Sequence, residues 1–325
     1  LGVKQLIVGV NKMDCDVAKY SIERFTEIKD EMVGMLAKVG WKKKFIQEHV
    51  PILPLSGFQG DNLINKTTNM DWWKGVDVKL VSDASKSIHI DTLLDALENF
   101  VIVPERSPDL TMRTPISGVY KIKGTGDVLT GRVEQGTVKP GDEVKFLPTH
   151  TKANNCVGKI FTVEMHHKTL PEAGAGLNVG FNVKGLVKTN MPRVGDIMVL
   201  KSDETLGAAK NFTCQVKILT HPGELKVGYS PIAFVRTARS AVKMAKIEWK
   251  IGKSTGGKKL PDPPFVKANE MAQIIFEPLQ PFVVASFKDC EGLGRVAIME
   301  GNSVVMLGKC IKVEVKKDVG KAKAK

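Results

Sequence analysis

The stretch that most constrains the fold is the apolar run Leu6–Val10, which ends directly in the polar tetrapeptide Asn11–Asp14. An unbroken apolar run of this length is typical of a parallel strand that is buried on both faces. In open α/β sheets, ligands bind beyond the carboxyl ends of such strands. The run therefore predicts an α/β domain with residues 11–14 at a ligand-binding edge. For the tetrapeptide alone, a strand followed by a plain polar turn is the alternative.

The tetrapeptide has the spacing Asn-Lys-x-Asp, which is the guanine-reading signature of GTPases. The Asp14 carboxylate accepts hydrogen bonds and donates none, while guanine offers it a ring N–H and an exocyclic amine. Adenine has no such pair of donors and would leave a buried acceptor unpaired, at a cost of about 1–3 kcal/mol. We expect Asn11 to tie the neighbouring loop to the base edge and the Lys12 stem to lie along the base face. Asn11, Lys12, Met13 and Asp14 are therefore candidate guanine-binding residues.

A second apolar run, Val50–Leu55, is followed by Ser56, Gly57 and Phe58. GTPases place a Ser-Gly or Ser-Ala turn after the next strand, where a backbone N–H meets the guanine oxygen. Gly57 suits close backbone approach, and Phe58 offers a ring that can stack on the base. An ordinary strand-to-loop turn is the alternative for this tripeptide in isolation. Two such turns, separated by one helix, are more specific than either alone and predict a shared guanine site.

Between the two runs, apolar residues recur every three or four positions and predict a helix over residues 22–39. Ser21 is a suitable N-cap for this helix and Gly40 a suitable stop. The rest of the region is expected to contain a basic surface turn at 41–44, a long polar insertion at 59–90 and a short helix at 92–97 capped by Asp91. The resulting order, strand–helix–strand–helix, indicates the rear half of an α/β nucleotide-binding domain.

Composition shifts across Pro104–Pro115, a stretch with three prolines that we interpret as a linker. Beyond it, turn signals recur about every 8–12 residues, as expected for a sandwich or barrel. Strands are predicted at 116–121, 128–134, 143–146, 157–165, 177–187 and 197–200, and then at 212–218, 232–238, 241–251, 270–276, 283–287, 294–299 and 309–315. We therefore expect domains over residues 1–105, 106–205 and 208–316, and a disordered basic tail over 317–325.

The 325 residues carry a net charge of +13, which favours polyanionic partners, nucleic acid above all. A generically basic protein is the alternative. Five scattered cysteines without a Cys-x-x-Cys pair indicate a reduced, cytosolic compartment. No apolar run is long enough to cross a membrane, and no secretory signal is present, so we expect a cytoplasmic protein without a membrane partner. The chain opens without Met and almost inside a strand, which we interpret as a truncation.

Taken together, the motifs of the whole chain resemble those of the elongation factor 1-alpha family, the eukaryotic and archaeal relatives of elongation factor Tu. The matching stretches are Leu6–Asp14 (LIVGVNKMD), Pro54–Asn62 (PLSGFQGDN), Gly124–Gly136 (GTGDVLTGRVEQG), Phe161–His167 (FTVEMHH), Asn178–Val183 (NVGFNV), Phe212–Gly223 (FTCQVKILTHPG) and Gly228–Ala238 (GYSPIAFVRTA). The resemblance implies the C-terminal half of an α/β P-loop-type GTPase domain followed by two antiparallel β-barrels. It also implies a GTP hydrolase that delivers aminoacyl-tRNA to the ribosomal A site.

The resemblance carries specific residues with it. Glu164 and His167 would lie near the terminal adenosine of aminoacyl-tRNA, and Asn178 would help hold the esterified amino acid; hydrogen bonding and stacking are the usual means of holding such a base. The second barrel would contact the T stem. Two exposed strand residues are the alternative for His166–His167, and a zinc site with Cys156 lacks ligand spacing. The implied partners are aminoacyl-tRNA, the ribosome, a guanine-nucleotide exchange factor and actin, with the protein a monomer.

The chain departs from the family pattern at several points. Phe58 replaces the usual tryptophan, and Arg236 and Arg239 stand where histidines are common, which directs positive charge toward RNA or simply toward solvent. The only P-loop candidate, Gly252–Ser254, has Ile247 where the first glycine is required and lies in a β-rich context. GTP or GDP is therefore expected to meet only the base-reading half of a site. Mg²⁺ ligands and catalytic residues are expected to be absent, and the chain by itself to be inactive.

Two rival functions remain open on the sequence. A paralogous termination or ribosome-rescue GTPase would share the barrels but differ at the aminoacyl-end pocket, and Glu164, His167 and Asn178 favour the elongation factor. An actin- or RNA-binding interaction protein would use the positive charge without nucleotide. Binding of charged but not uncharged tRNA would separate the elongation factor from the first rival. Co-sedimentation with actin without binding of aminoacyl-tRNA would favour the second.

Overall fold

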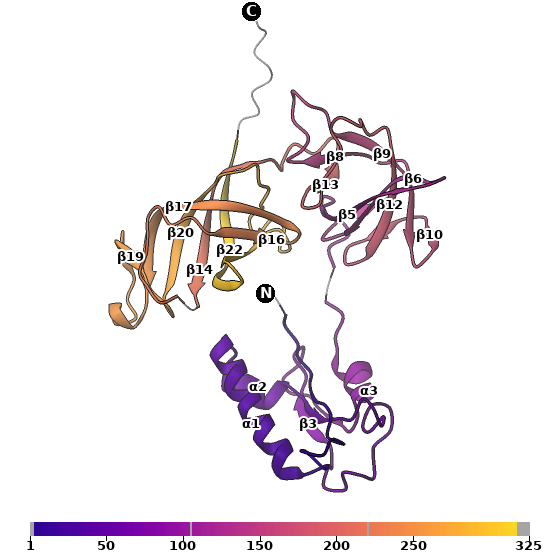
Figure 1. Cartoon of the computed structure of the whole chain (residues 1–325), viewed down its shortest axis with the longest axis vertical. Coiled ribbons are helices and arrows are strands. Elements are labelled where there is room, and N and C mark those ends of the chain that lie inside the picture. Colours follow the sequence, from indigo (N-terminus) through magenta and orange to yellow (C-terminus); the bar gives the residue numbers. More distant parts are fainter. Residues whose placement is uncertain (1–2, 105, 220, 317–325) are drawn as a thin grey trace, which may run out of the picture. The chain divides into compact units, whose positions relative to one another are not determined.

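The computed structural model describes residues 3–104, 106–219 and 221–316 of the chain (Figure 1). The chain divides into two compact units, one within residues 2–105 and one within residues 106–325. The basic tail predicted at 317–325 lies outside the described residues. No helix among the described residues is both long enough and apolar enough to span a bilayer.

The first unit is built on a parallel pair of strands, β1 (Val8–Val10) and β2 (Ile52–Pro54), with Val8 opposite Ile52 and Val10 opposite Pro54. Two helices, α1 (Ile22–Val39) and α2 (Lys43–His49), connect them (Figure 1). A parallel pair needs such a crossover because its strands run in the same direction. The α/β character predicted from the apolar runs is confirmed.

Helix α1 begins and ends where its sequence predicts. The Ser21 side chain accepts a hydrogen bond from the backbone N–H of Arg24, which satisfies one of the free donors of the first turn. Gly40 ends the helix with φ of 121°, a conformation that residues with a Cβ rarely adopt, and its N–H donates to the carbonyls of Leu36 and Ala37.

Three predictions in this unit are wrong. The residues predicted as a basic surface turn start helix α2, with Lys42 as its N-cap; the lysines mask the short apolar face that buries Ile46. The polar insertion contains a hairpin of β3 (Val76–Lys79) and β4 (Ser87–Ile90). Thr92, not Asp91, caps α3 (Leu93–Asp95), because its side chain and that of Asp95 form a reciprocal capping box; the π-helical turn η1 (Ala96–Phe100) follows.

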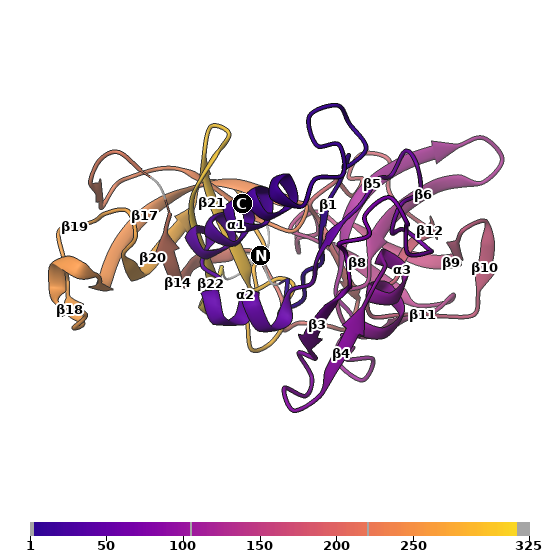
Figure 2. The ribbon, with the colours of Figure 1, turned by 90° about the horizontal axis from the view of Figure 1, so that it is seen from below.

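The second unit contains two closed six-stranded antiparallel barrels (Figure 2), as predicted. In the first, the pairing of β8 with β9 closes the ring, and β10 extends β9 as a short hairpin. Its strands are β5 (Thr114–Ile122), β6 (Gly126–Arg132), β8 (Glu143–Leu147), β9 (Val157–Met165), β10 (Lys168–Leu170), β12 (Asn178–Lys184) and β13 (Ile197–Leu200), with the small pair β7 (Thr137–Val138) and β11 (Ala173–Gly174) beside them.

In the second barrel, the pairing of β16 with β17 closes the ring. Its strands are β14 (Ala209–Ile218), β16 (Ile232–Val235), β17 (Ala238–Ile251), β18 (Leu260–Pro261), β20 (Met271–Pro278), β21 (Arg295–Glu300) and β22 (Ser303–Val315), with the small pair β15 (Leu225–Lys226) and β19 (Phe265–Val266) and the 3₁₀ turn η2 (Lys253–Thr255). Alternation of buried and exposed residues along β14 and β20 directs one side of each strand inward.

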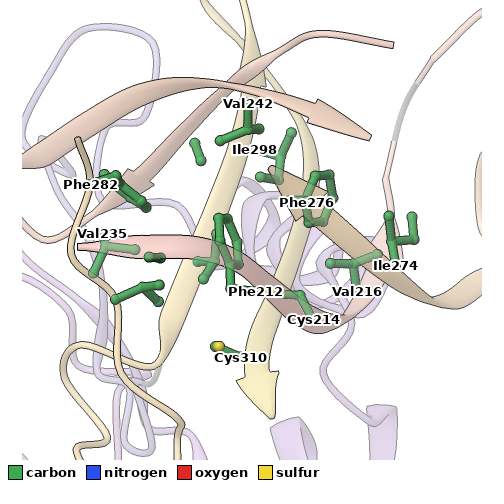
Figure 3. Close-up of a cluster of buried hydrophobic side chains, with 14 of the residues drawn as sticks. Phe212, Cys214, Val216, Val235, Val242, Ile274, Phe276, Phe282, Ile298 and Cys310 are labelled. Atoms are coloured by element: carbon green, nitrogen blue, oxygen red, sulfur yellow. The ribbon is translucent and has the colours of Figure 1, made fainter. Parts of the chain in front are cut away.

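Aromatic side chains fill the core of the second barrel (Figure 3). The ring of Phe212 lies 5.6 Å from that of Phe276 and 6.0 Å from that of Phe282, measured between centroids. The strand predicted at 283–287 is wrong. Only Val283 forms an isolated bridge, with Ala208, and residues 282–285 enter the core as irregular chain. Their apolar run reflects burial, which a core-filling loop shares with a strand.

Candidate functional site

The parallel pairing of β1 and β2 brings the two polar turns of the α/β unit together. Beyond the last paired residues, the Leu55 N–H donates to the Val10 carbonyl at 2.8 Å, and the Met13 N–H donates to the Leu55 carbonyl at 3.1 Å. The backbone of one turn therefore continues the ladder onto the other. Asn11–Asp14 and Ser56–Phe58 form one continuous edge, as the order of strands predicts.

Asn11 links the two turns through its side chain. Its Oδ1 accepts the Gly57 N–H at 2.8 Å and the Lys12 N–H at 2.7 Å. A Cβ at Gly57 would lie 3.4 Å from the Asn11 amide group, which is an ordinary van der Waals contact, so this approach does not itself require a glycine. Lys12 has φ of 63° and is exposed, which leaves its stem free at the edge. The Gly57 N–H that we expected to meet a guanine oxygen is thus occupied by Asn11.

Asp14 meets the second turn directly. Its Oδ1 accepts a hydrogen bond of 2.6 Å from the hydroxyl of Ser56, a fully buried residue. Among the described residues, the other carboxylate oxygen has no hydrogen-bond partner. A carboxylate held on one side and open on the other can accept the two parallel donors of a guanine edge. The Asp14 carboxylate is therefore an acceptor that suits the two donors of a guanine base.

The remaining two predicted residues differ in their surroundings. Met13 is only 1% exposed and belongs to the core of the α/β unit, so its side chain anchors the turn and does not reach a ligand. Phe58 is 89% exposed, the opposite extreme. A ring that is fully in solvent is available to cover the face of a bound base.

Tyr20 and Asp61 support this edge, and no sequence pattern pointed to either residue. The Tyr20 N–H donates to the Met13 carbonyl, and its hydroxyl donates to Asp61 Oδ2 at 2.8 Å. This hydrogen bond to a carboxylate, together with burial, raises the pKa of the Tyr20 hydroxyl. Asp61 lies 41 residues away in the sequence, and no local pattern reports a contact at that separation.

The second candidate site lies on the outer face of the first barrel. Glu164 on β9 is exposed and lies opposite Gly180 on β12; Gly180 lies opposite Thr130 on β6, and Thr130 lies opposite Gly118 on β5. A Cβ added at Gly180 would meet no atom closer than 3.8 Å. The row therefore places a carboxylate beside open backbone at Gly180, whereas the side chains of Tyr120 and Thr130 cover Gly118.

Asn178 and His167 flank this row. Asn178 precedes Gly180 by two residues on β12 and shares its face, since side chains alternate along a strand. His166 and His167 are not strand residues. They form the two-residue turn between β9 and β10, with φ of 51° and 61°, as in a type I′ hairpin. Among the described residues, no hydrogen bond joins Glu164, His167 and Asn178 to one another.

Other residues considered on the sequence lie elsewhere. Arg236 forms a 2.7 Å ion pair with Glu134 of the first barrel. Its positive charge is therefore neutralised by a carboxylate of the same chain. Burial raises the pKa of the Cys156 thiol to about 12. No cluster of three or more histidine, cysteine or acidic side chains that could hold a metal ion occurs within the part of the chain that the structure describes.

Comparisons with known proteins match both barrels and nearly the whole chain. A family model described as elongation factor Tu domain 2 matches residues 126–199, and one described as GTP-eEF1A C-terminal domain-like matches residues 211–311. Elongation factor 1-alpha of Euglena gracilis is 40% identical over 321 residues, which cover 99% of this chain and 66% of that protein. The oocyte form of elongation factor 1-alpha of Xenopus laevis is 40% identical over 308 residues, covering 95% and 64%.

Solved structures agree on the fold. Sup35 complexed with GMPPNP is similar with a TM-score of 0.58 at 23% identity, over 96% of this chain and 70% of that one. Sup35 complexed with GDP gives a TM-score of 0.57 at 24% identity, with the same coverage. The chain thus spans 66% and 64% of the lengths of the two curated relatives. The resemblance inferred from the sequence motifs is confirmed.

Proposed function

The chain belongs to the elongation factor 1-alpha family, and we propose that the protein is a translation elongation factor that binds GTP and delivers aminoacyl-tRNA to the ribosomal A site. The observation that carries the proposal is the pairing of the two turns, in which Asn11 binds Gly57 and Asp14 binds Ser56.

The α/β unit reads the guanine base. Asp14 accepts the ring N–H and the exocyclic amine, Asn11 holds the two turns at a fixed spacing, and the Lys12 stem and the Phe58 ring cover the two faces of the base. Met13 contributes through its backbone and through its buried side chain, which anchors the turn. The open oxygen of Asp14 and the exposure of Phe58 support these roles. The cofactor is therefore GTP or GDP.

The first barrel holds the aminoacylated end of tRNA. Glu164 accepts hydrogen bonds from the terminal adenosine, which lies along the open backbone at Gly180, while His167 stacks from the hairpin turn. Asn178 binds the esterified amino acid. The shared outer face of Glu164, Gly180 and Asn178 supports this assignment. Residues 106–205 form this aminoacyl-end domain, residues 208–316 form a second domain for the T stem, and residues 1–105 belong to the GTP-binding domain.

Hydrolysis of GTP belongs to the proposed function but not to this chain alone. The 325 residues contain no Gly-x-x-x-x-Gly-Lys-Ser/Thr motif, so nothing in the sequence supplies the backbone cradle for phosphates or the hydroxyl for Mg²⁺. Gly252–Thr255 lies in a 3₁₀ turn after a β-strand and does not open a helix. We expect the chain by itself to show no GTP turnover. The ribosome, an exchange factor and actin are further proposed partners, in the cytoplasm.

The test is a filter-binding comparison of charged and uncharged tRNA in the presence of GTP. Because the phosphate-binding segment must be supplied, the chain is joined to the N-terminal region of the Euglena gracilis elongation factor 1-alpha. We expect the fusion to bind aminoacyl-tRNA and to discriminate against uncharged tRNA, and Glu164→Ala to reduce that discrimination. Equal binding of both tRNAs by the fusion would overturn the proposal and favour a paralogous factor.

A further inference from the structure

A lysine-rich loop projects from the second barrel between β17 and β18. It covers residues 252–259, which the sequence shows as a P-loop look-alike, and the structure folds it as the 3₁₀ turn η2 followed by a glycine turn. Gly256 and Gly257 adopt φ of 61° and 76°, where a residue with a Cβ would be strained. The proposed function assigns residues 208–316 as a whole to the T stem but gives no role to this loop.

The base of the loop is fixed by a buried carboxylate. Glu270 forms a 3.2 Å ion pair with Lys250, and both side chains are at most 6% exposed. The Ser254 hydroxyl donates to Glu270 at 2.7 Å, and the Lys267 N–H donates to it at 2.8 Å. Burial alone would raise the pKa of Glu270, but these hydrogen bonds and Lys250 lower it. A charged, fully bonded group therefore holds the loop in one place.

The tip of the loop carries cations without counter-charges. Lys253, Lys258 and Lys259 are exposed, and none of them has an ion pair among the described residues. The neighbouring lysines of β17 are different: Lys246 pairs with Asp262 and Lys250 with Glu270. A rigid platform that presents unneutralised positive charge is suited to a polyanion.

An aromatic ring lies beside these charges. Trp249 on β17 is half-buried, and Lys259 Nζ lies 4.7 Å from the centroid of its ring. Trp249 faces Gln273 on β20 across the strand pair. Aromatic rings next to lysines are the usual construction of sites for single-stranded nucleic acid, because the rings stack on bases while the lysines meet phosphates.

We propose that Trp249 and the loop lysines 253, 258 and 259 form a binding site for the phosphodiester backbone of single-stranded RNA, with a base stacked at Trp249. The choice of RNA as the polyanion rests on the proposed function, which places the protein among RNAs. The site is separate from the row around Glu164 on the first barrel, and it differs from the proposed T-stem contact of the second barrel because it binds single-stranded RNA.

The test measures binding of the full chain to a fluorescein-labelled oligouridylate by anisotropy over a range of salt. Replacing the three loop lysines by Gln is expected to reduce affinity about tenfold and the salt slope by about 2, since each single-strand phosphate contact contributes about 0.7. Trp249→Ala is expected to cost a further about tenfold loss, and Trp249→Phe to retain most affinity. The matched control replaces Lys217, Lys309 and Lys312, which are exposed on β14 and β22 of the same barrel and have no ion pair among the described residues.

Two outcomes would overturn the proposal. If the control triple variant loses as much affinity and slope as the loop variant, the attraction is general and the loop is not a site. If the loop variant keeps RNA binding but loses binding to phosphatidylserine vesicles, the surface serves a membrane. In the fusion, the loop variant is also expected to keep its discrimination between charged and uncharged tRNA. The proposed function is tested separately by the Glu164→Ala variant, so failure of one proposal can be distinguished from failure of the other.

Discussion

The two candidate sites of this protein are constructed in opposite ways. In the α/β unit, the predicted residues bind one another: Asn11 holds Gly57, and Asp14 holds Ser56. On the first barrel, Glu164 and Asn178 share the outer face and His167 lies in the β9–β10 turn, and no hydrogen bond among the described residues joins the three. The first site is organised before any ligand arrives, whereas the second is a surface whose elements are placed by strand register. Substitutions should therefore affect structure and binding together in the first site, and binding alone in the second.

The largest expected effect comes from Asp14→Ala in the fusion that carries a phosphate-binding segment. Loss of the carboxylate leaves the donors of guanine unpaired, which costs about 1–3 kcal/mol and corresponds to a roughly 5- to 150-fold weaker affinity for GDP. Isothermal titration calorimetry measures the change. Asp16→Ala removes an exposed carboxylate two residues away and is the matched control. An unchanged GDP affinity in Asp14→Ala would contradict the assignment of Asp14 to guanine binding in the α/β unit.

The second prediction concerns the open space beside Gly180 on the outer face of the first barrel. Gly180→Val adds a side chain where space is open, so we expect aminoacyl-tRNA binding by the fusion to fall about tenfold with little change in melting temperature. Gly131→Ala is the contrasting variant, since its Cβ would lie 2.6 Å from the Pro115 carbonyl oxygen and should destabilise the barrel. Filter binding and thermal unfolding followed by circular dichroism separate the two. A Gly180→Val variant that melts early would show that this face is structurally constrained.

The third prediction tests whether the first site is structural as well as functional. Asn11→Ala removes the acceptor of the Gly57 and Lys12 N–H groups, and we expect the α/β unit to lose about 1–2 kcal/mol of unfolding free energy. Chemical denaturation followed by tryptophan fluorescence gives the value, because three of the four tryptophans, Trp41, Trp72 and Trp73, lie in that unit. Asn178→Ala, on the barrel, is expected to leave unfolding unchanged. Equal effects of the two substitutions would remove the distinction between the sites.

The smallest effect is a pH dependence confined to the α/β unit. The hydrogen bond from His89 to Asp77 raises the pKa of the imidazole, against burial and with help from Asp91. A raised pKa stabilises the folded state fully below the ordinary value of 6.5, and the contribution is lost as pH rises through the higher folded value. We expect His89→Gln to flatten this slope in unfolding experiments between about pH 5 and pH 8. A variant with the same slope as the parent would remove His89 as its source.

The sequence was informative where a feature is local. Ser21 and Gly40 carry their capping chemistry in single residues, and the apolar run at Val50–Leu55 is buried throughout, as predicted. The run at Leu6–Val10 was expected to be buried on both faces, but only Val10 is buried and Gly9 is exposed. It was uninformative where the feature depends on distant partners. The contact of Tyr20 with Asp61 and the row through Gly180 arise from register and chain crossover.

The remaining wrong predictions concern segments whose residue pattern is typical of a different structure. Lysines conceal the short apolar face of α2, and the apolar stretch at 283–287 looks like a strand because core-filling coil is equally apolar. The hairpin turn at His166–His167 was missed because two histidines are not the usual residues for left-handed positions, although histidine is among the residues that tolerate them.

We propose that the turns after β1 and β2 together select guanine. The most direct test is saturation-transfer difference NMR of the full chain with guanosine and adenosine, because ligand-observed NMR detects weak binding without phosphate contacts. We expect transfer to guanosine, little to adenosine, and loss of the guanosine signal in Asp14→Ala. Equal transfer to both nucleosides, or a guanosine signal that survives Asp14→Ala, would contradict it.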